Sequence, residues 1–482
     1  MERIDTELII KRSMRGVAAL ISRTFFLNII SFASFLVITS VLAASEIGIY
    51  TAVIAIQRVI AFFTDFGLGA ALVQKKEELR KEDITTTFTV QALVTIAIFF
   101  LVVIFLNQFA IFFKLNTDAQ NLLLVLVFTI FLSSFKTIPS ILLERTLNFG
   151  KLVFPQIIES LTFNVILIGL TLAGYGISSF TWAFLVSSLV GIPFYYLVNP
   201  WKISLGIDKK SLNYLKYGIQ FQAKNILGTI KDDLLIVILP LFLSFTQIGY
   251  IGFAQRLAFY IFRYVVDSVT KVTFSAYSRA QHDLVFLKTA IEKSLFFVSA
   301  SMFPILFGLI AVAPYLIKFY PNWSNKWEPA TFSIIFFCLN AAVSSLSGIL
   351  VNVLDSTGKV KVTLRLMVLW TILIWILTPL FIHFYGYNGV SVASFLVTTT
   401  IVYTVFLVKK IVNFKFLPSI IKPLIASILM TVAVFSLSNL FAKDFLSLIF
   451  VILTGGVLYI TGLFIMAKKE LRDGLVKFGI RL

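Results

Sequence analysis

Long apolar stretches alternate with short polar segments along the whole chain. Fourteen stretches are long enough for an α-helix to cross the hydrocarbon core of a bilayer, which takes about 20 apolar residues. Each stretch is continuous, whereas a strand of a transmembrane β-barrel alternates apolar and polar residues over about ten positions. The pattern therefore predicts an all-α polytopic membrane protein. The predicted spans are residues 17–43, 47–74, 84–106, 119–143, 153–174, 177–198, 214–243, 248–277, 286–313, 329–353, 361–382, 388–408, 418–440 and 445–467.

Composition also favours a membrane protein over a soluble one. The 482 residues are 59% hydrophobic and 13% charged, whereas a soluble domain is about half apolar and about a quarter charged. A single cysteine, Cys338, excludes an intramolecular disulfide, and the two histidines belong to no Cys/His cluster. We therefore expect no metal site and no cofactor. No connection is long enough for an extramembrane catalytic domain, so we expect no catalytic residue and a protein that is not an enzyme.

Lys and Arg residues gather in alternate connections between the spans. With the N-terminus inside, 29 of the 41 Lys and Arg residues fall on the cytoplasmic side and 4 on the opposite side. Such an asymmetry indicates orientation by the positive-inside rule. We therefore expect a multi-pass protein of the bacterial cytoplasmic membrane with both termini in the cytoplasm. Because the Lys and Arg residues cluster in this way, membrane topology explains most of the net charge of +18. We therefore expect no nucleic-acid partner.

Short motifs recur along the chain at nearly one offset. Residues 46–48 (Glu-Ile-Gly) recur as 247–249 (Gln-Ile-Gly), and 175–176 (Tyr-Gly) recur as 385–386. Because these matches keep one order, they indicate two homologous six-helix lobes in the parallel-repeat plan of a transporter. The expected segments are a cytoplasmic surface segment at 1–16, an N-lobe at 17–200, a linker at 201–213, a C-lobe at 214–410, two further helices at 411–467 and a basic cytoplasmic tail at 468–482.

Charged residues inside the predicted spans carry the candidate chemistry. Each such group costs roughly 3 kcal/mol at the bilayer centre on insertion scales, so it usually faces a cavity or another charge. Apart from the charged residues assigned to the cytoplasmic segments, eight cations stand against five acids, which leaves an excess of positive charge. The cations are Arg23, Arg58, Lys136, Lys224, Lys231, Arg256, Arg263 and Lys271, and the acids are Asp65, Glu159, Asp232, Asp233 and Asp267.

Helical spacing concentrates the cations on the first two spans of each lobe. Arg256, Arg263 and Asp267 share one face of the eighth span, and Arg58 shares a face of the second span with Asp65. We therefore predict a basic cavity between the lobes that selects a phosphate or diphosphate ligand. The candidate ligand-binding residues are Arg23, Arg58, Lys224, Arg256 and Arg263.

The acids in the spans have two possible roles. For Asp65, Glu159 and Asp267 we expect pairing with a cation in preference to binding a coupling ion such as a proton or sodium. Asp232 and Asp233 follow Lys231 directly, and they either titrate together or lie at a helix break near water. The sequence does not distinguish these two readings and does not identify a coupling ion.

Three stretches resemble a known transporter family. Residues 43–50 (AASEIGIY) and 64–75 (TDFGLGAALVQK) resemble the opening of Wzx-type polysaccharide transporters. These are lipid-linked oligosaccharide flippases of the multidrug/oligosaccharidyl-lipid/polysaccharide exporter superfamily. Residues 142–151 (LLERTLNFGK) resemble the loop after span four of that family. The stretch at 65–74 is similar to the branch that contains the colanic acid and teichuronic acid exporters.

The resemblance implies transport of an oligosaccharide linked to polyprenyl diphosphate, such as undecaprenyl diphosphate, from the inner to the outer leaflet for surface polysaccharide biosynthesis. Alternating access is the implied mechanism, and the implied partners are this substrate, membrane lipids and the polysaccharide polymerase machinery. In related lipid flippases, arginines of the first two helices of each lobe meet the diphosphate. The matching positions are Arg23, Arg58 and Arg256, with Lys224 and Arg263 adjacent.

Three other classes of protein are alternatives to a flippase. A multidrug or organic-cation antiporter of the same superfamily shares the fold, but it needs acids exposed in its cavity, and the basic excess argues against it. A membrane glycosyltransferase or polymerase would need catalytic groups on sizeable outer loops, which this chain lacks. A structural scaffold would have no need of thirteen charged residues inside its spans. The antiporter is therefore the main alternative.

Overall fold

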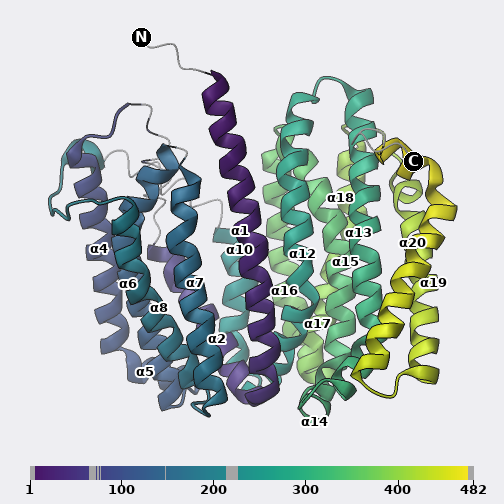
Figure 1. The fold of residues 1–482 in the computed structure, drawn as a ribbon, viewed down its shortest axis with the longest axis horizontal. Coiled ribbons are helices and arrows are strands. Elements are labelled where there is room, and N and C mark those ends of the chain that lie inside the picture. Colours follow the sequence, from purple (N-terminus) through teal and green to yellow (C-terminus); the bar gives the residue numbers. More distant parts are fainter. Residues whose placement is uncertain are drawn as a thin grey trace. The chain divides into compact units, whose positions relative to one another are not determined.

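The computed structural model describes the backbone of residues 6–64, 72, 75, 77–146, 148–212 and 226–475 (Figure 1). The side chains of residues 6–22, 226, 261, 263, 264, 469 and 471–475 fall outside this description. Every regular element in these residues is helical, and 11 helical segments among them are long and apolar enough to cross a membrane. One of these segments, Val360–Lys409, contains two predicted spans. The predicted all-α membrane fold is confirmed.

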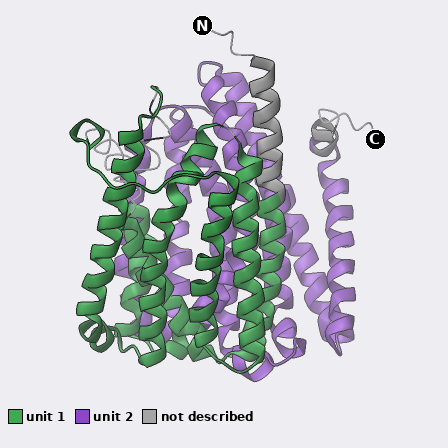
Figure 2. Ribbon diagram, turned by 60° about the vertical axis from the view of Figure 1, so that its left-hand side comes forward, with its two compact units in different colours: residues 1–249 green, residues 250–482 purple. Residues whose placement is uncertain are grey.

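The chain forms two compact units, Met1–Gly249 and Tyr250–Leu482 (Figure 2). In unit 1, α6 packs against α2, α4 and α8, and α7 packs against α1 and α8. Its described elements are α1 (Thr6–Val41), α2 (Ala44–Thr64), α4 (Lys81–Ile104), α5 (Leu106–Phe113), α6 (Thr117–Arg145), α7 (Phe149–Leu172), α8 (Ser178–Val198), α10 (Ile226–Thr229), the π-helix η1 (Ile230–Leu234), α11 (Leu235–Ile238) and the 3-10 helix η2 (Leu239–Leu241).

Unit 2 contains the second half of the chain. Its long helix α13 packs against α15, α19 and α20, so the two helices predicted after the second lobe contact α13 through a buried apolar cluster that includes Phe296, Met430 and Leu448. The elements are α12 (Phe245–Arg279), which begins in unit 1, α13 (Leu284–Phe319), α14 (Ser324–Trp327), η3 (Glu328–Ala330), α15 (Thr331–Ser356), α16 (Val360–Tyr385), η4 (Gly386–Asn388), α17 (Gly389–Thr398), α18 (Ile401–Lys409), α19 (Phe416–Phe441) and α20 (Phe445–Leu475).

The helix α6 illustrates how the sequence forms these elements. Its N-cap is Asn116, whose side-chain Oδ1 accepts a hydrogen bond of 3.0 Å from the amide of Ala119, and such a cap satisfies one of the free amides of a first turn. Leu122, Leu126 and Ile130, at i, i+4 and i+8, are all buried. The same helix carries a polar stripe further along, and that stripe lines the cavity described below.

The repeated tripeptides form matching helix starts. The Glu46 carboxylate accepts a 2.7 Å hydrogen bond from the amide of Ala43 at the start of α2, and the Gln247 side chain accepts a 3.0 Å bond from the amide of Ser244 at the start of α12. Gly48 and Gly249 then allow the two backbones to touch. A Cβ atom on Gly48 would lie 1.7 Å from the carbonyl oxygen of Phe245. The repeat therefore marks a backbone crossing that only glycine permits.

A buried charge pair and a partly exposed one connect the loops at one end of unit 1. The Lys75 ammonium lies 2.6 Å from a carboxylate oxygen of Asp83, and both side chains are 2% exposed. Ser211 donates a 2.7 Å hydrogen bond to the same carboxylate, and Arg80 lies 3.3 Å from Asp208. These contacts hold the segment before α4 against the segment that follows α8.

Arg145 has a structural role at the same end of unit 1. Its guanidinium donates hydrogen bonds of 2.8 and 2.7 Å to the carbonyls of Leu72 and Lys75, and a third to the carbonyl of Glu77. Arg145 belongs to the family-like stretch 142–151, and Lys75 ends the stretch 64–75, most of which lies outside the described residues. Both were predicted only as topology-setting cations, but in the structure they fix this loop.

Candidate functional site

Arg58 on α2 meets an acid of η1. Its Nη1 atom lies 3.3 Å from Oδ1 of Asp233, with the two side chains 49% and 20% exposed. Lys231, on the same π-helix, lies 2.9 Å from Oδ1 of Asp232. The two neighbouring carboxylates thus have different cationic partners, and each pair remains partly open. An exposed guanidinium of this kind retains donors for a further anion.

The acids Asp232 and Asp233 lie in a widened helical turn. The segment Ile230–Leu234 is a π-helix between α10 and α11, and such π-turns occur frequently at functional sites of proteins. The sequence had left open a titrating pair or a helix break at this position. The structure has a π-turn whose two carboxylates contact different cations, and the choice between a titrating pair and a helix break near water stays a prediction.

Arg23 on α1 faces the interior of unit 1. Its Nε atom is buried and has no hydrogen-bond partner, and an unpaired buried donor costs about 1–3 kcal/mol. The hydroxyl of Tyr195 on α8 lies within electrostatic reach of both Arg23 and Glu159. Arg23 therefore lies near the polar interior between α7 and α8 and retains a donor for a ligand.

The remaining predicted site residues divide into three groups. Arg256 is half-buried and Asp267 is exposed on α12 in unit 2, so the predicted cavity between the lobes remains a prediction. Asp65 and Lys224 lie outside the described residues, as does the side chain of Arg263. Lys271, an intramembrane cation not chosen as a ligand, is exposed. No group of three or more His, Cys, Asp and Glu residues suited to a metal is found where the structure describes the chain.

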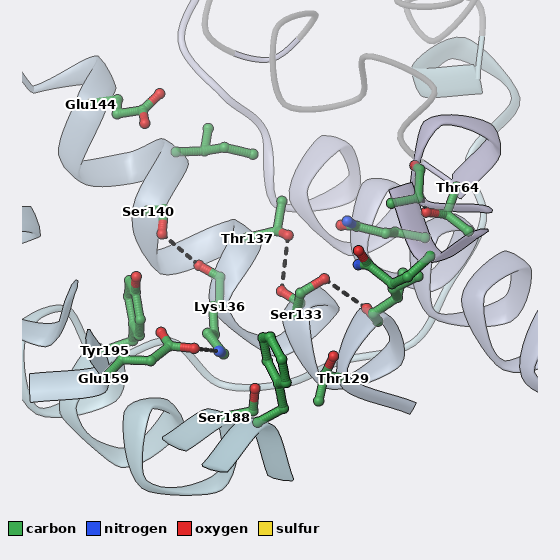
Figure 3. A pocket seen from close by; sticks show the side chains of 16 residues that line it. Thr64, Thr129, Ser133, Lys136, Thr137, Ser140, Glu144, Glu159, Ser188 and Tyr195 are labelled. Carbon is green, nitrogen blue, oxygen red and sulfur yellow. Dashed lines mark hydrogen bonds and ion pairs between the residues drawn. The ribbon is translucent and has the colours of Figure 1, made fainter. Parts of the chain in front are cut away.

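A polar cavity of about 870 Å³ lies within unit 1 (Figure 3). This volume is within the range of about 300 to 1,000 Å³ of small-molecule sites. Side chains of five helices, α2, α4, α6, α7 and α8, line it, and most of them are polar. The lining residues are Gln57, Ala61, Thr64, Gln91, Thr129, Ile130, Ser133, Lys136, Thr137, Ser140, Ile141, Glu144, Glu159, Phe184, Ser188 and Tyr195. We call this the unit 1 cavity.

An ion pair crosses one wall of the unit 1 cavity. The Lys136 ammonium on α6 donates a hydrogen bond to Oε1 of Glu159 on α7, as Figure 3 shows. The side chains are 12% and 26% exposed. Gly191 on α8 leaves room for the carboxylate, because a Cβ atom there would lie 3.0 Å from Oε2 of Glu159. The one cation among the described residues that line the cavity is therefore neutralised by its neighbour.

No pattern in the sequence was interpreted as this cavity. Glu159 was expected to pair with a cation, but Lys136 was not identified as that partner, and the hydroxyl residues around the two were given no role. A signal was nevertheless present: Thr129, Ser133, Lys136, Ser140 and Glu144 follow helical spacing on α6 and form one polar stripe. A polar stripe inside a predicted span indicates a face turned away from lipid.

Comparison with known sequences identifies relatives. A family model described as "Polysaccharide biosynthesis protein" matches residues 37–331. The succinoglycan biosynthesis transport protein ExoT of Rhizobium meliloti (strain 1021) is 25% identical over 296 residues. That match spans 60% of this chain and 59% of the curated relative.

Solved structures share the fold. The lipid II flippase MurJ in an inward closed conformation superposes with a TM-score of 0.75 at 19% identity, over 94% of this chain and 100% of that one. An inward-facing multidrug resistance MATE family transporter of the MOP superfamily gives a TM-score of 0.63 at 12% identity, over 82% and 98% of the two chains. At these identities the likeness concerns the fold alone. All of these solved structures and the curated relative are described as transporters or flippases.

Proposed function

Because the chain belongs to the polysaccharide biosynthesis protein family, whose model matches residues 37–331, we propose that it is a flippase for a lipid-linked oligosaccharide. The substrate is an oligosaccharide on a polyprenyl diphosphate such as undecaprenyl diphosphate. The protein carries it from the inner to the outer leaflet by alternating access, and polymerase machinery takes up the product. Both termini face the cytoplasm, in line with the 29 to 4 distribution of Lys and Arg between the two sides.

Family membership carries the proposal, and the cations of unit 1 support it. Arg23 has a buried Nε without a partner, and the guanidinium of Arg58 is half exposed beside Asp233. A diphosphate offers several acceptor oxygens to such groups, and charge-assisted hydrogen bonds between Arg and phosphate are often bidentate. Arg23 and Arg58 are therefore the proposed diphosphate ligands of unit 1. Arg256 on α12, Lys224 and Arg263 are the further proposed ligands, as the sequence predicts.

The acids act as charge partners in this scheme. Asp233 neutralises Arg58 while no substrate is bound, and the incoming diphosphate displaces it. The exchange is inexpensive because ion pairs that remain open to solvent contribute only about 0–1 kcal/mol. Asp65 and Asp267 are proposed partners of cations on their own helices. The prenyl chain stays in the lipid, next to the apolar side chains that the helices expose, such as Val165 and Leu197.

The test is an assay of lipid transport in proteoliposomes. A fluorescent polyprenyl-diphosphate disaccharide is incorporated, and its appearance in the opposite leaflet is followed by a membrane-impermeant quencher. We expect transport that depends on the protein. The rival antiporter shares the fold of the MATE neighbour, and the same vesicles would instead show proton-linked efflux of a cationic dye. Dye efflux without lipid transport would refute the flippase and support the antiporter.

A further inference from the structure

The unit 1 cavity is unsuited to the diphosphate. Among the described residues that line it, Lys136 is the one cation, and Glu144 and Glu159 are the two acids. Lys136 is already paired with Glu159, so an arriving anion meets a neutralised cation and an uncompensated carboxylate. An anionic group would be repelled from such a site in a low-dielectric interior. The cavity must therefore accept a different part of the substrate.

The hydroxyl groups of α6 offer acceptors to the cavity. Thr129, Ser133, Thr137 and Ser140 each donate their hydroxyl proton to a carbonyl of their own helix, at 2.7, 2.6, 3.1 and 2.8 Å. A hydroxyl has one proton and two lone pairs. Because the hydroxyl proton already forms this bond, the oxygen lone pairs remain able to accept a hydrogen bond from a ligand. Figure 3 shows these side chains along one wall of the cavity.

The α2 and α4 side of the cavity adds two amides. Gln57 and Gln91 line it, and Oε1 of Gln91 is buried without a hydrogen-bond partner. Leaving a buried acceptor unpaired costs about 1–3 kcal/mol, which a donating ligand would recover. Phe184 and Tyr195 add aromatic surface. Aromatic surface with a few converging polar groups is typical of small-molecule sites.

We propose that the unit 1 cavity is a subsite for an uncharged sugar residue of the transported glycan. A neutral sugar donates through several hydroxyls and carries no charge, so it matches a wall that is rich in acceptors and has an excess of acid. A uronic acid or a phosphorylated sugar carries an anionic group that can only accept hydrogen bonds. Such a sugar is disfavoured in a cavity of this kind. The inference rests on the proposed function, since the lipid-linked glycan is what delivers a sugar to this cavity.

The location of the cavity agrees with this assignment. Gln57 lines the cavity and directly precedes Arg58 in α2, and Tyr195 lies within electrostatic reach of Arg23. Arg58 is thus the next residue after a lining residue, and Arg23 interacts electrostatically with another lining residue. The sugar nearest the diphosphate is the one that would enter it.

The experiment compares two lipids in the proteoliposome assay. They share one polyprenyl diphosphate and differ only in the first sugar, which is glucose in one and glucuronic acid in the other. We expect the glucose lipid to be transported about tenfold faster or more, because sites built around hydrogen bonds to hydroxyls discriminate strongly. Equal rates, or faster transport of the glucuronic acid lipid, would overturn the inference while leaving the flippase proposal intact. Transport of neither lipid would instead refute the proposed function.

Two variants locate the preference in this cavity. Glu159→Gln removes one acid and frees Lys136, so transport of the glucuronic acid lipid should rise at least fivefold relative to the glucose lipid. Gln91→Leu removes the amide whose oxygen has no partner. It should slow transport of the glucose lipid about tenfold, which is the effect expected when one hydrogen bond to a ligand is lost. The matched control is Gln120→Leu on α6, which lies outside the lining set. A sugar preference that neither variant changes would place the discrimination elsewhere and overturn the assignment.

Discussion

Substitution of Gly48 by alanine tests the crossing of α2 and α12. The new Cβ atom would lie 1.7 Å from the carbonyl oxygen and 2.6 Å from the carbonyl carbon of Phe245. Both are backbone atoms, so no side-chain rotation relieves the clash and the helices themselves must move. Overpacking of this kind typically costs about 1–3 kcal/mol, and we expect the upper end of that range. Gly249→Ala should behave alike, because its Cβ would lie 1.9 Å from the carbonyl oxygen of Ala44.

Thermal unfolding of the purified protein in detergent measures this cost. For a unit of this size, about 3 kcal/mol corresponds to a fall in Tm of roughly 6–12 °C. The matched control is Gly456→Ala in α20, where nothing lies within 4 Å of the added atom. That change should leave Tm equal or slightly higher, because alanine favours a helix by about 0.5–1 kcal/mol over glycine. Equal Tm values for Gly48→Ala and Gly456→Ala would show that the two helices do not touch at this point.

Three further predictions concern the charge pairs. Asp83→Ala should destabilise the protein by about 3–5 kcal/mol because it removes the buried carboxylate that lies 2.6 Å from the buried Lys75. By contrast, Glu77→Ala should leave Tm unchanged, because the Glu77 side chain is 75% exposed and lies 3.9 Å from Lys75. Asp233→Asn should free Arg58 and tighten binding of inorganic pyrophosphate up to about fivefold by calorimetry, and weaker binding would contradict the displacement scheme. Hydrogen bonds from Ser211 hold the pKa of Asp208 below its ordinary value of 3.8, so its contribution to stability is complete above that pH and is lost as the pH falls through the lowered pKa. Asp208→Asn should therefore reduce the acid dependence of Tm below pH 4, and an unchanged dependence would contradict the assignment.

Much of the fold was predictable because hydrophobic length carries the signal. A stretch of about 20 apolar residues crosses a bilayer as a helix, because its backbone groups must bond to one another. Runs such as 119–143 and 286–313 therefore predicted helices, and the structure contains them as α6 and α13. The recurrence of 46–48 as 247–249 was also visible, although its physical reason was not. A repeated tripeptide indicates homology, whereas the contact between Gly48 and Phe245 is a fact of three-dimensional packing.

The pairing of charges was less predictable. Helical spacing associated Arg58 with Asp65 on its own helix, but the structure pairs it with Asp233, 175 residues away. Lys136 was predicted only as a cation inside a span, and it contacts Glu159 on the next helix. Such partners depend on how α6 packs against α7 and α2 against η1, and no spacing rule within one helix contains that information.

The central claim is that the cations of unit 1 bind the diphosphate of a lipid-linked oligosaccharide during transport. The most direct measurement is the rate at which the fluorescent polyprenyl-diphosphate disaccharide changes leaflet, compared among the intact protein, Arg23→Ala, Arg58→Ala and the control Lys151→Ala, an exposed cation at the start of α7. The account predicts transport by the intact protein and the control, and a loss of at least tenfold in both arginine variants at equal reconstitution. Unchanged transport in both arginine variants would contradict it.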